Sequence, residues 1–152
     1  MKKFFPLVLL ILVFSCSSDD NGQDADDNAE AYFGTWVLVE SNVNPPLDAN
    51  DDGTTSRNLL DEVECLTGTI VLNDNFRFTL TSVEPIITAI TGDLYIVSCS
   101  SPTADLGLWA YVDDTIVLEG SQDIVFEVSG NRMTFISGLD LPEVQSIVYE
   151  KQ

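Results

Sequence analysis

The pattern that most constrains the fold is a period-two alternation in the middle of the chain. Phe76, Phe78 and Leu80 are separated from one another by single polar residues. Successive side chains of a strand point to opposite faces, so the segment predicts a strand with one buried and one solvated face. The triplet Asn73-Asp74-Asn75 just before it predicts a turn.

Short apolar segments of this kind recur between turn signals along most of the chain. They cover residues 34–40, 69–72, 94–99, 109–112, 115–118, 124–129, 132–136 and 144–150. Asp113-Asp114 and Gly130-Asn131 each join two of them into a predicted hairpin, and the second pair suits a two-residue turn with positive φ. Residues 58–65 predict a short helix or turn over one end of the sheet. About eight strands joined in this way predict an all-β, antiparallel, up-and-down barrel.

Residues 1–15 predict a bacterial lipoprotein signal peptide. Two lysines precede an apolar run over 4–14, and this run is shorter than the roughly 20 residues that a membrane-spanning helix needs. The run ends in Val13-Phe14-Ser15-Cys16, which resembles the lipobox, where the cysteine thiol is diacylated before cleavage. We therefore expect a mature chain that begins with a lipid-bearing Cys16. A plain signal peptide followed by an incidental cysteine is the alternative.

Residues 16–31 are polar and acidic, and we expect a disordered linker because they offer little apolar surface to bury. Ser18, Asp19 and Asp20 follow the predicted lipid site directly. They resemble the acidic surface-export signal of lipoproteins from the Bacteroidetes group. That resemblance implies a place in the outer, cell-surface leaflet of the outer membrane. The alternative is a solvated spacer that carries no export signal.

Residues 32–152 form the predicted domain. Gly34-Thr35-Trp36 opens its first strand, and Gly107-Leu108-Trp109 repeats the Gly-x-Trp pattern late in the chain. The layout resembles the lipocalin-like lipoproteins of Bacteroidetes. The resemblance implies a lipocalin-like barrel in which Trp36 plugs the closed end.

Composition excludes several functions. The chain has 25 acidic and 6 basic residues, for a formal net charge of −19, so it repels the phosphates of nucleic acids. It has no histidine, which removes Ser-His-Asp triads and histidine zinc sites. No glycine-rich phosphate loop is present, and none of the many carboxylates is singled out for glycoside hydrolysis. We therefore expect a protein that is not an enzyme.

Cys65 and Cys99 remain once Cys16 is assigned to lipid. An even pair in an oxidising compartment predicts a disulfide. Two free thiols or a metal-binding pair are the alternatives.

An acidic loop at residues 48–53 matches the first half of an EF-hand. Asp48, Asn50 and Asp52 would supply side-chain oxygens to Ca²⁺, and Thr54 a backbone carbonyl. The twelfth position, where a bidentate glutamate belongs, is Leu59. The alternative is a solvated loop in which the same residues make Asx turns.

Two functions remain open. In the first, the barrel binds a small apolar or amphipathic molecule, and its membrane contact is the lipid anchor. In the second, the barrel is packed solid and contacts a protein or glycan as a structural or interaction module. Candidate ligand-binding residues are Phe76, Phe78, Leu80, Phe126, Met133 and Phe135 on the inner wall, with Trp109 and Tyr111 at a rim.

Overall fold

The computed structural model describes residues 29–91, 94–137 and 144–152. The predicted signal peptide, the lipid site Cys16 and the export residues Ser18, Asp19 and Asp20 lie outside these ranges. Within the described ranges, no helix has the length and apolar character needed to cross a bilayer.

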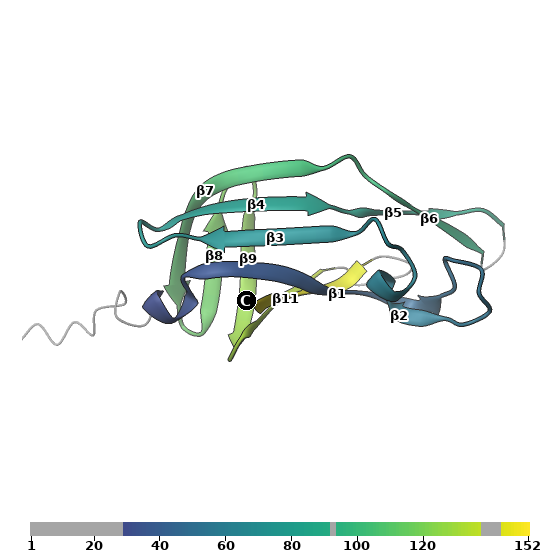
Figure 1. The fold of residues 1–152 in the computed structure, drawn as a ribbon, viewed down its shortest axis with the longest axis horizontal. Helices are drawn as coiled ribbons and strands as arrows, with labels where there is room; N and C mark the ends of the chain where they lie inside the picture. The colour runs from purple at the N-terminus through teal and green to yellow at the C-terminus, as the bar shows by residue number, and fades with distance from the viewer. Residues whose placement is uncertain (1–28, 92–93, 138–143) are drawn as a thin grey trace, which may run out of the picture.

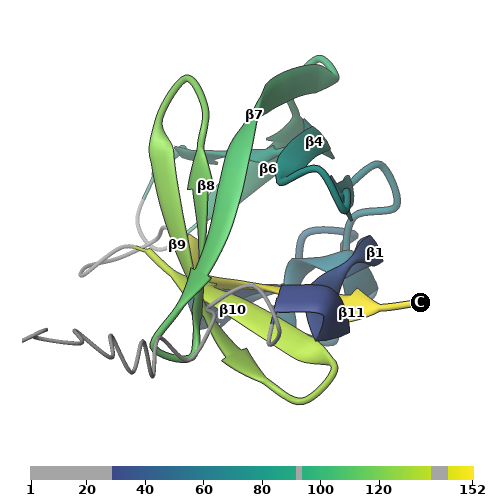
Figure 2. The ribbon, with the colours of Figure 1, turned by 90° about the vertical axis from the view of Figure 1, so that its left-hand side faces the viewer.

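Eight antiparallel strands close into a barrel (Figures 1 and 2), which confirms the predicted fold class. Each barrel strand pairs with the next one along the chain, and the last pairs with the first. In order, they are β1 (Gly34–Leu47), β3 (Thr67–Leu72), β4 (Arg77–Val83), β7 (Thr103–Val112), β8 (Thr115–Glu119), β9 (Asp123–Ser129), β10 (Arg132–Ile136) and β11 (Val144–Lys151).

Three additions decorate the barrel. A 3₁₀ turn, η1 (Glu30–Tyr32), precedes β1 at one end. At the other end, β2 (Ser56–Asn58) pairs with β1 and leads into a second 3₁₀ turn, η2 (Leu59–Asp61), where a short helix or turn was expected. The β5 (Pro85–Ala89) and β6 (Tyr95–Cys99) hairpin extends from β4 and β7 beyond the barrel, on the side away from η1 (Figure 1).

The hairpin turns follow from residues that tolerate positive φ. Asp113 and Asp114 adopt φ of 49° and 61°, and Gly130 adopts 60°, so both predicted hairpins are confirmed. Phe76 also has a positive φ, 58°, and lies in the turn before β4 rather than in the strand. The prediction that it begins the alternating strand was therefore wrong: β4 starts at Arg77, and only Phe78 and Leu80 continue its inner face.

A β-bulge in β1 decides which of its residues face the interior. Leu38 pairs with Tyr149, but the next paired residue is Glu40, opposite Val148, so Val39 is an extra residue. An extra residue shifts the alternation by one. Trp36 and Leu38 point inward before the bulge, and Ser41 is buried after it, whereas strict alternation would have buried Glu40.

The apolar core has two parts. The larger lies inside the barrel, around Trp36, Phe78, Trp109 and Phe126. The smaller lies beyond it, where Val43, Leu47, Leu59 and Leu66 pack together under the β5–β6 hairpin.

Candidate functional site

One end of the barrel is filled by aromatic rings, and we call it the closed end. Both indole N–H groups are satisfied there: Trp36 donates to the Tyr32 carbonyl and Trp109 to the Asn73 carbonyl, each at 3.0 Å. Phe33 packs edge-on against Trp109 at 5.6 Å between ring centroids, and Phe76 lies 5.5 Å from the same ring. Trp36 and Trp109 are 0% and 2% exposed, so this end is sealed.

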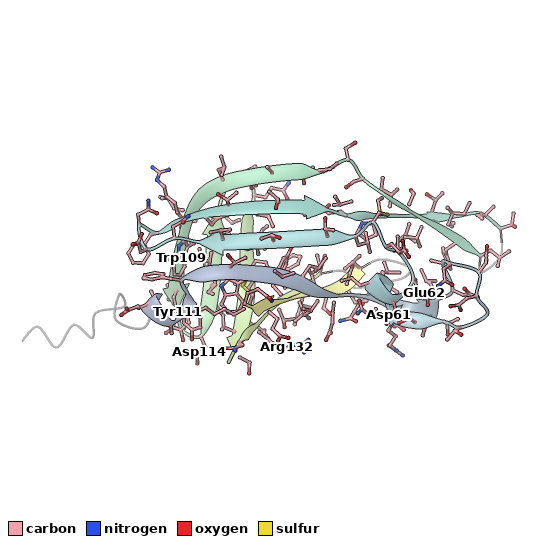
Figure 3. The ribbon with its side chains drawn as sticks, in the orientation of Figure 1. Asp61, Glu62, Trp109, Tyr111, Asp114 and Arg132 are labelled. Carbon is pink, nitrogen blue, oxygen red and sulfur yellow. A yellow bond between two sulfur atoms is a disulfide. The ribbon has the colours of Figure 1, made fainter. Side chains whose placement is uncertain are left out.

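Tyr111 completes the closed end. Its ring lies 4.5 Å from that of Tyr32, and its hydroxyl donates to Asp114 at 2.8 Å. Hydrogen bonding with Tyr32 first, and with Asp114 second, raises the pKa of the Tyr111 hydroxyl above its ordinary value. Figure 3 shows Trp109, Tyr111 and Asp114 together at this end, on the opposite side of the molecule from Asp61 and Glu62.

The other half of the barrel contains a cavity of about 230 Å³. It extends from the barrel interior to the point where β4 ends and β9 begins. Its wall is mostly apolar and comes from the barrel strands β1, β3, β4, β9, β10 and β11, from β5, and from the segments between them. The lining side chains include Leu38, Leu66, Leu80, Ile124, Phe126, Phe135 and Ile147.

Two buried hydroxyl-bearing side chains, Ser41 and Tyr149, interrupt this apolar wall. Ser41 is 2% exposed, and its Oγ is buried with no hydrogen-bond partner among the described residues. Its backbone N–H is occupied separately, because it donates to Asn58 Oδ1 at 3.0 Å.

Tyr149 is the second. It is 5% exposed, and a Cβ at Gly68 would lie 2.7 Å from its hydroxyl, so the glycine makes room for this ring. Burial, with a smaller contribution from the charge of Glu84, raises the pKa of Tyr149 to about 12. The hydroxyl is therefore protonated at neutral pH and can donate a hydrogen bond.

The mouth of the cavity is formed by the exposed residues Glu84, Gln122 and Asp123. A neighbouring hollow of about 290 Å³ shares Leu80, Ser82 and Ile124 with the cavity.

Asp105 lines the neighbouring hollow and accepts hydrogen bonds from the backbone N–H and hydroxyl of Ser121. These bonds hold the pKa of Asp105 below its usual range, so it stays ionised. None of the basic residues in the described part of the chain, Arg57, Arg77, Arg132 and Lys151, lines either space. The mouth is therefore anionic.

The predicted ligand-binding residues divide among the cavity wall, the packed core and the closed end. Leu80, Phe126 and Phe135 line the cavity. The other five do not: Phe78 and Met133 belong to the packed core, and Phe76, Trp109 and Tyr111 lie in the closed end. Trp109 and Tyr111 are thus not at a rim, because η1 covers their end of the barrel. Sequence reasoning missed Ser41 and Tyr149, whose inward positions depend on the β1 bulge and on the β1–β11 register.

The predicted Cys65–Cys99 disulfide is present, with its Cα atoms 6.3 Å apart. It joins the end of β6 to the segment that leads into β3. Leu66 and Thr67 follow Cys65 directly and line the cavity. The crosslink therefore holds one wall of the cavity against the β5–β6 hairpin.

The acidic loop folds around its own backbone amides. Asp48 accepts hydrogen bonds from the N–H groups of Asp52 and Gly53, at 3.1 and 2.9 Å. The Thr54 N–H donates to Asp52 at 2.7 Å and is the main reason that the pKa of Asp52 lies below its usual value. The Asn50 side-chain amide makes two hydrogen bonds to Asp52: its Nδ2 donates to the carboxylate, and its Oδ1 accepts from the backbone N–H.

These are the bonds of Asx turns, which were the alternative to calcium. Within residues 29–91, 94–137 and 144–152, no three Asp, Glu, Cys or His side chains are grouped so that they could hold a metal ion. Calcium binding by Asp48, Asn50, Asp52 and Thr54 stays a prediction.

Comparison with known proteins gives no further guidance. No protein-family model, curated protein or solved structure matches this chain significantly.

Proposed function

We propose that this protein is a lipid-anchored binding protein that holds a small apolar or amphipathic molecule in the cavity half of its barrel. The observation that supports this proposal is the contrast within one core. The closed end is filled by its own side chains, whereas the other half has about 230 Å³ of space lined mainly by apolar groups. Ligand pockets are typically apolar concavities with a few polar groups that fix orientation.

Two neighbouring residues on β9 provide a test. Ile124 lines the cavity, whereas Val125 points outward and is 49% exposed. Ile124→Trp should fill the cavity, and Val125→Trp should leave it open. Binding of the uncharged fluorophore N-phenyl-1-naphthylamine to the purified full chain is measured by fluorescence titration.

We expect Ile124→Trp to weaken binding at least about tenfold, which corresponds to about 1.4 kcal/mol. Val125→Trp should change it by less than about twofold. Equal binding by both variants, or no binding by the unchanged protein, would refute the proposed function.

The lipid anchor on Cys16 and the cell-surface location are part of the proposal. Val13-Phe14-Ser15-Cys16 supports lipidation, and Ser18, Asp19 and Asp20 support display on the cell surface in the manner of the lipocalin-like lipoproteins of Bacteroidetes. Metabolic labelling with an alkyne fatty acid should label the protein, and Cys16→Ala should abolish the label. Surface protease should degrade the unchanged protein in intact cells but spare a variant with Ser18, Asp19 and Asp20 replaced by alanine.

A second candidate function is contact with another protein through the β5–β6 hairpin. Its outward face exposes Ile86, Ile90, Leu94 and Ile96, by 49%, 54%, 65% and 56%. Exposed apolar patches of this kind often mark interaction sites. A photocrosslinking residue at Ile96 should then give a discrete adduct in intact cells, and the same residue at the outward-facing Glu127 should give none. Identical patterns at both positions would exclude this role.

A further inference from the structure

The polar groups of the cavity indicate which kind of molecule it suits. The cavity is smaller than the roughly 300–1,000 Å³ of pockets that enclose drug-sized ligands. A medium-length alkyl chain is therefore closer to its capacity than a long lipid tail.

Ser41 supplies the main constraint on the polar part of the molecule. A buried hydroxyl without a partner costs free energy, and an occupant without a hydrogen-bonding group near it leaves it unpaired. The Ser41 Oγ can both donate and accept, and Tyr149, protonated at neutral pH, also lines the cavity. An alcohol or carbonyl oxygen can bond either group without bringing a charge into the apolar wall.

The charges disfavour the two ionic alternatives. A carboxylate would have to pass or remain beside Glu84 and Asp123, and the chain as a whole carries a formal charge of −19. An ammonium group would meet these carboxylates only at the mouth, where both are exposed and salt screens the attraction. It would also leave Ser41 without a partner.

The geometry points to an uncharged amphiphile as the ligand, with an apolar body of medium length and one hydroxyl or carbonyl oxygen that hydrogen-bonds Ser41 inside the barrel. This inference rests on the proposed function, because it assigns the ligand class of the same cavity. Binding of a hydrophobic molecule with any head group would agree with the proposed function, whereas the inference requires that the head group is uncharged and carries a hydroxyl or carbonyl oxygen.

The test uses three probes with the same alkyl chain: 1-decanol, decanoate and decylammonium. Each probe is titrated against the fluorophore bound to the full chain at neutral pH, below the solubility limit of 1-decanol and below the micelle-forming concentrations of the two ions. We expect 1-decanol to bind at least about tenfold more tightly than either ion. Ser41→Ala should weaken the binding of 1-decanol about three- to tenfold, the usual range for one hydrogen bond, and leave the affinities of the two ions unchanged. Ser98→Ala, on the exposed face of β6, is the matched control and should change nothing.

Each alternative outcome has a distinct meaning. Binding of decanoate or decylammonium as tight as that of 1-decanol would overturn the uncharged class while leaving the binding function intact. Loss of decylammonium binding in Glu84→Gln would then assign the head group to the mouth. Equal effects of Ser41→Ala on all three probes would overturn the role of Ser41. No displacement by any probe, together with no fluorophore binding, would refute the proposed function itself.

Discussion

The two ends of the barrel differ in how their buried polar groups are paired. At the closed end, both buried indole N–H groups reach backbone carbonyls, and the rings of Tyr32 in η1 and of the following Phe33 pack against Trp36 and Trp109. In the cavity half, the buried Ser41 hydroxyl has no partner in the described residues, and apolar side chains line a cavity that the protein's own atoms do not fill. Unfilled volume and unpaired polar groups both lower stability. The contrast indicates that the closed end stabilises the fold, whereas the other end keeps features that stability alone does not explain.

The largest expected effect is at the closed end. Trp36→Ala removes a fully buried ring and should reduce the free energy of unfolding by about 3–5 kcal/mol. Leu80→Ala, at the cavity wall, should cost about 2 kcal/mol or less, because Leu80 already borders space and loses fewer contacts. Urea unfolding of both variants measures the difference. A cost of Leu80→Ala as large as that of Trp36→Ala would contradict the division between the two ends.

Removal of the disulfide should separate the two ends experimentally. The double change Cys65→Ser and Cys99→Ser frees a loop of sequence separation 34, and should cost about 3–4 kcal/mol on the chain-entropy model. Hydrogen exchange should accelerate in β5, β6 and around Leu66, near the cavity.

Tryptophan fluorescence gives the control for that experiment. Both tryptophans of the chain lie at the closed end. Their emission under native conditions should be the same with and without the crosslink. A shifted emission spectrum would show that the disulfide supports the whole barrel rather than its cavity half.

Tyr149 makes the cavity half sensitive to alkaline pH. Its pKa is raised to about 12 in the folded state, so the folded protein keeps this proton where the unfolded chain, with a pKa near 10, loses it. The resulting stability is fully present below about pH 10 and is lost as the pH rises to about 12. The loss from this group is about 2 kcal/mol. Tyr149→Phe should therefore flatten the decline in urea midpoint over this window; an unchanged slope would show that the hydroxyl is not protected by burial.

The sequence predicted the closed end better than the cavity. Local signals were sufficient for the alternating Phe78 and Leu80 and for the Asp113-Asp114 and Gly130-Asn131 turns, and the resemblance to lipocalin-like proteins implied the place of Trp36 at the closed end. Phe76 was wrongly predicted to lie in the strand, because it adopts a positive φ in the turn, which is uncommon for a bulky side chain. The cavity depends on non-local information: the bulge at Val39 sets the direction of Ser41, and Gly68 leaves room for Tyr149 from another strand. No pattern within a single segment carries that information.

Ser41 gives the smallest expected effect and separates stability from function most directly. Ser41→Ala removes a buried unpaired hydroxyl, so it should raise the free energy of unfolding by about 1 kcal/mol, whereas the exposed control Ser98→Ala should change it by less than about 0.5 kcal/mol. Saturating 1-decanol should then stabilise the unchanged protein more than the variant. A ligand at free concentration L raises the free energy of unfolding by RT ln(1 + L/Kd), and the unchanged protein has the lower Kd. The difference in free energy of unfolding between Ser41→Ala and the unchanged protein should therefore decrease or change sign when 1-decanol is added. A variant that is less stable than the unchanged protein without ligand would show that Ser41 has a structural partner, and the reason for its place in the cavity wall would have to be sought in the fold.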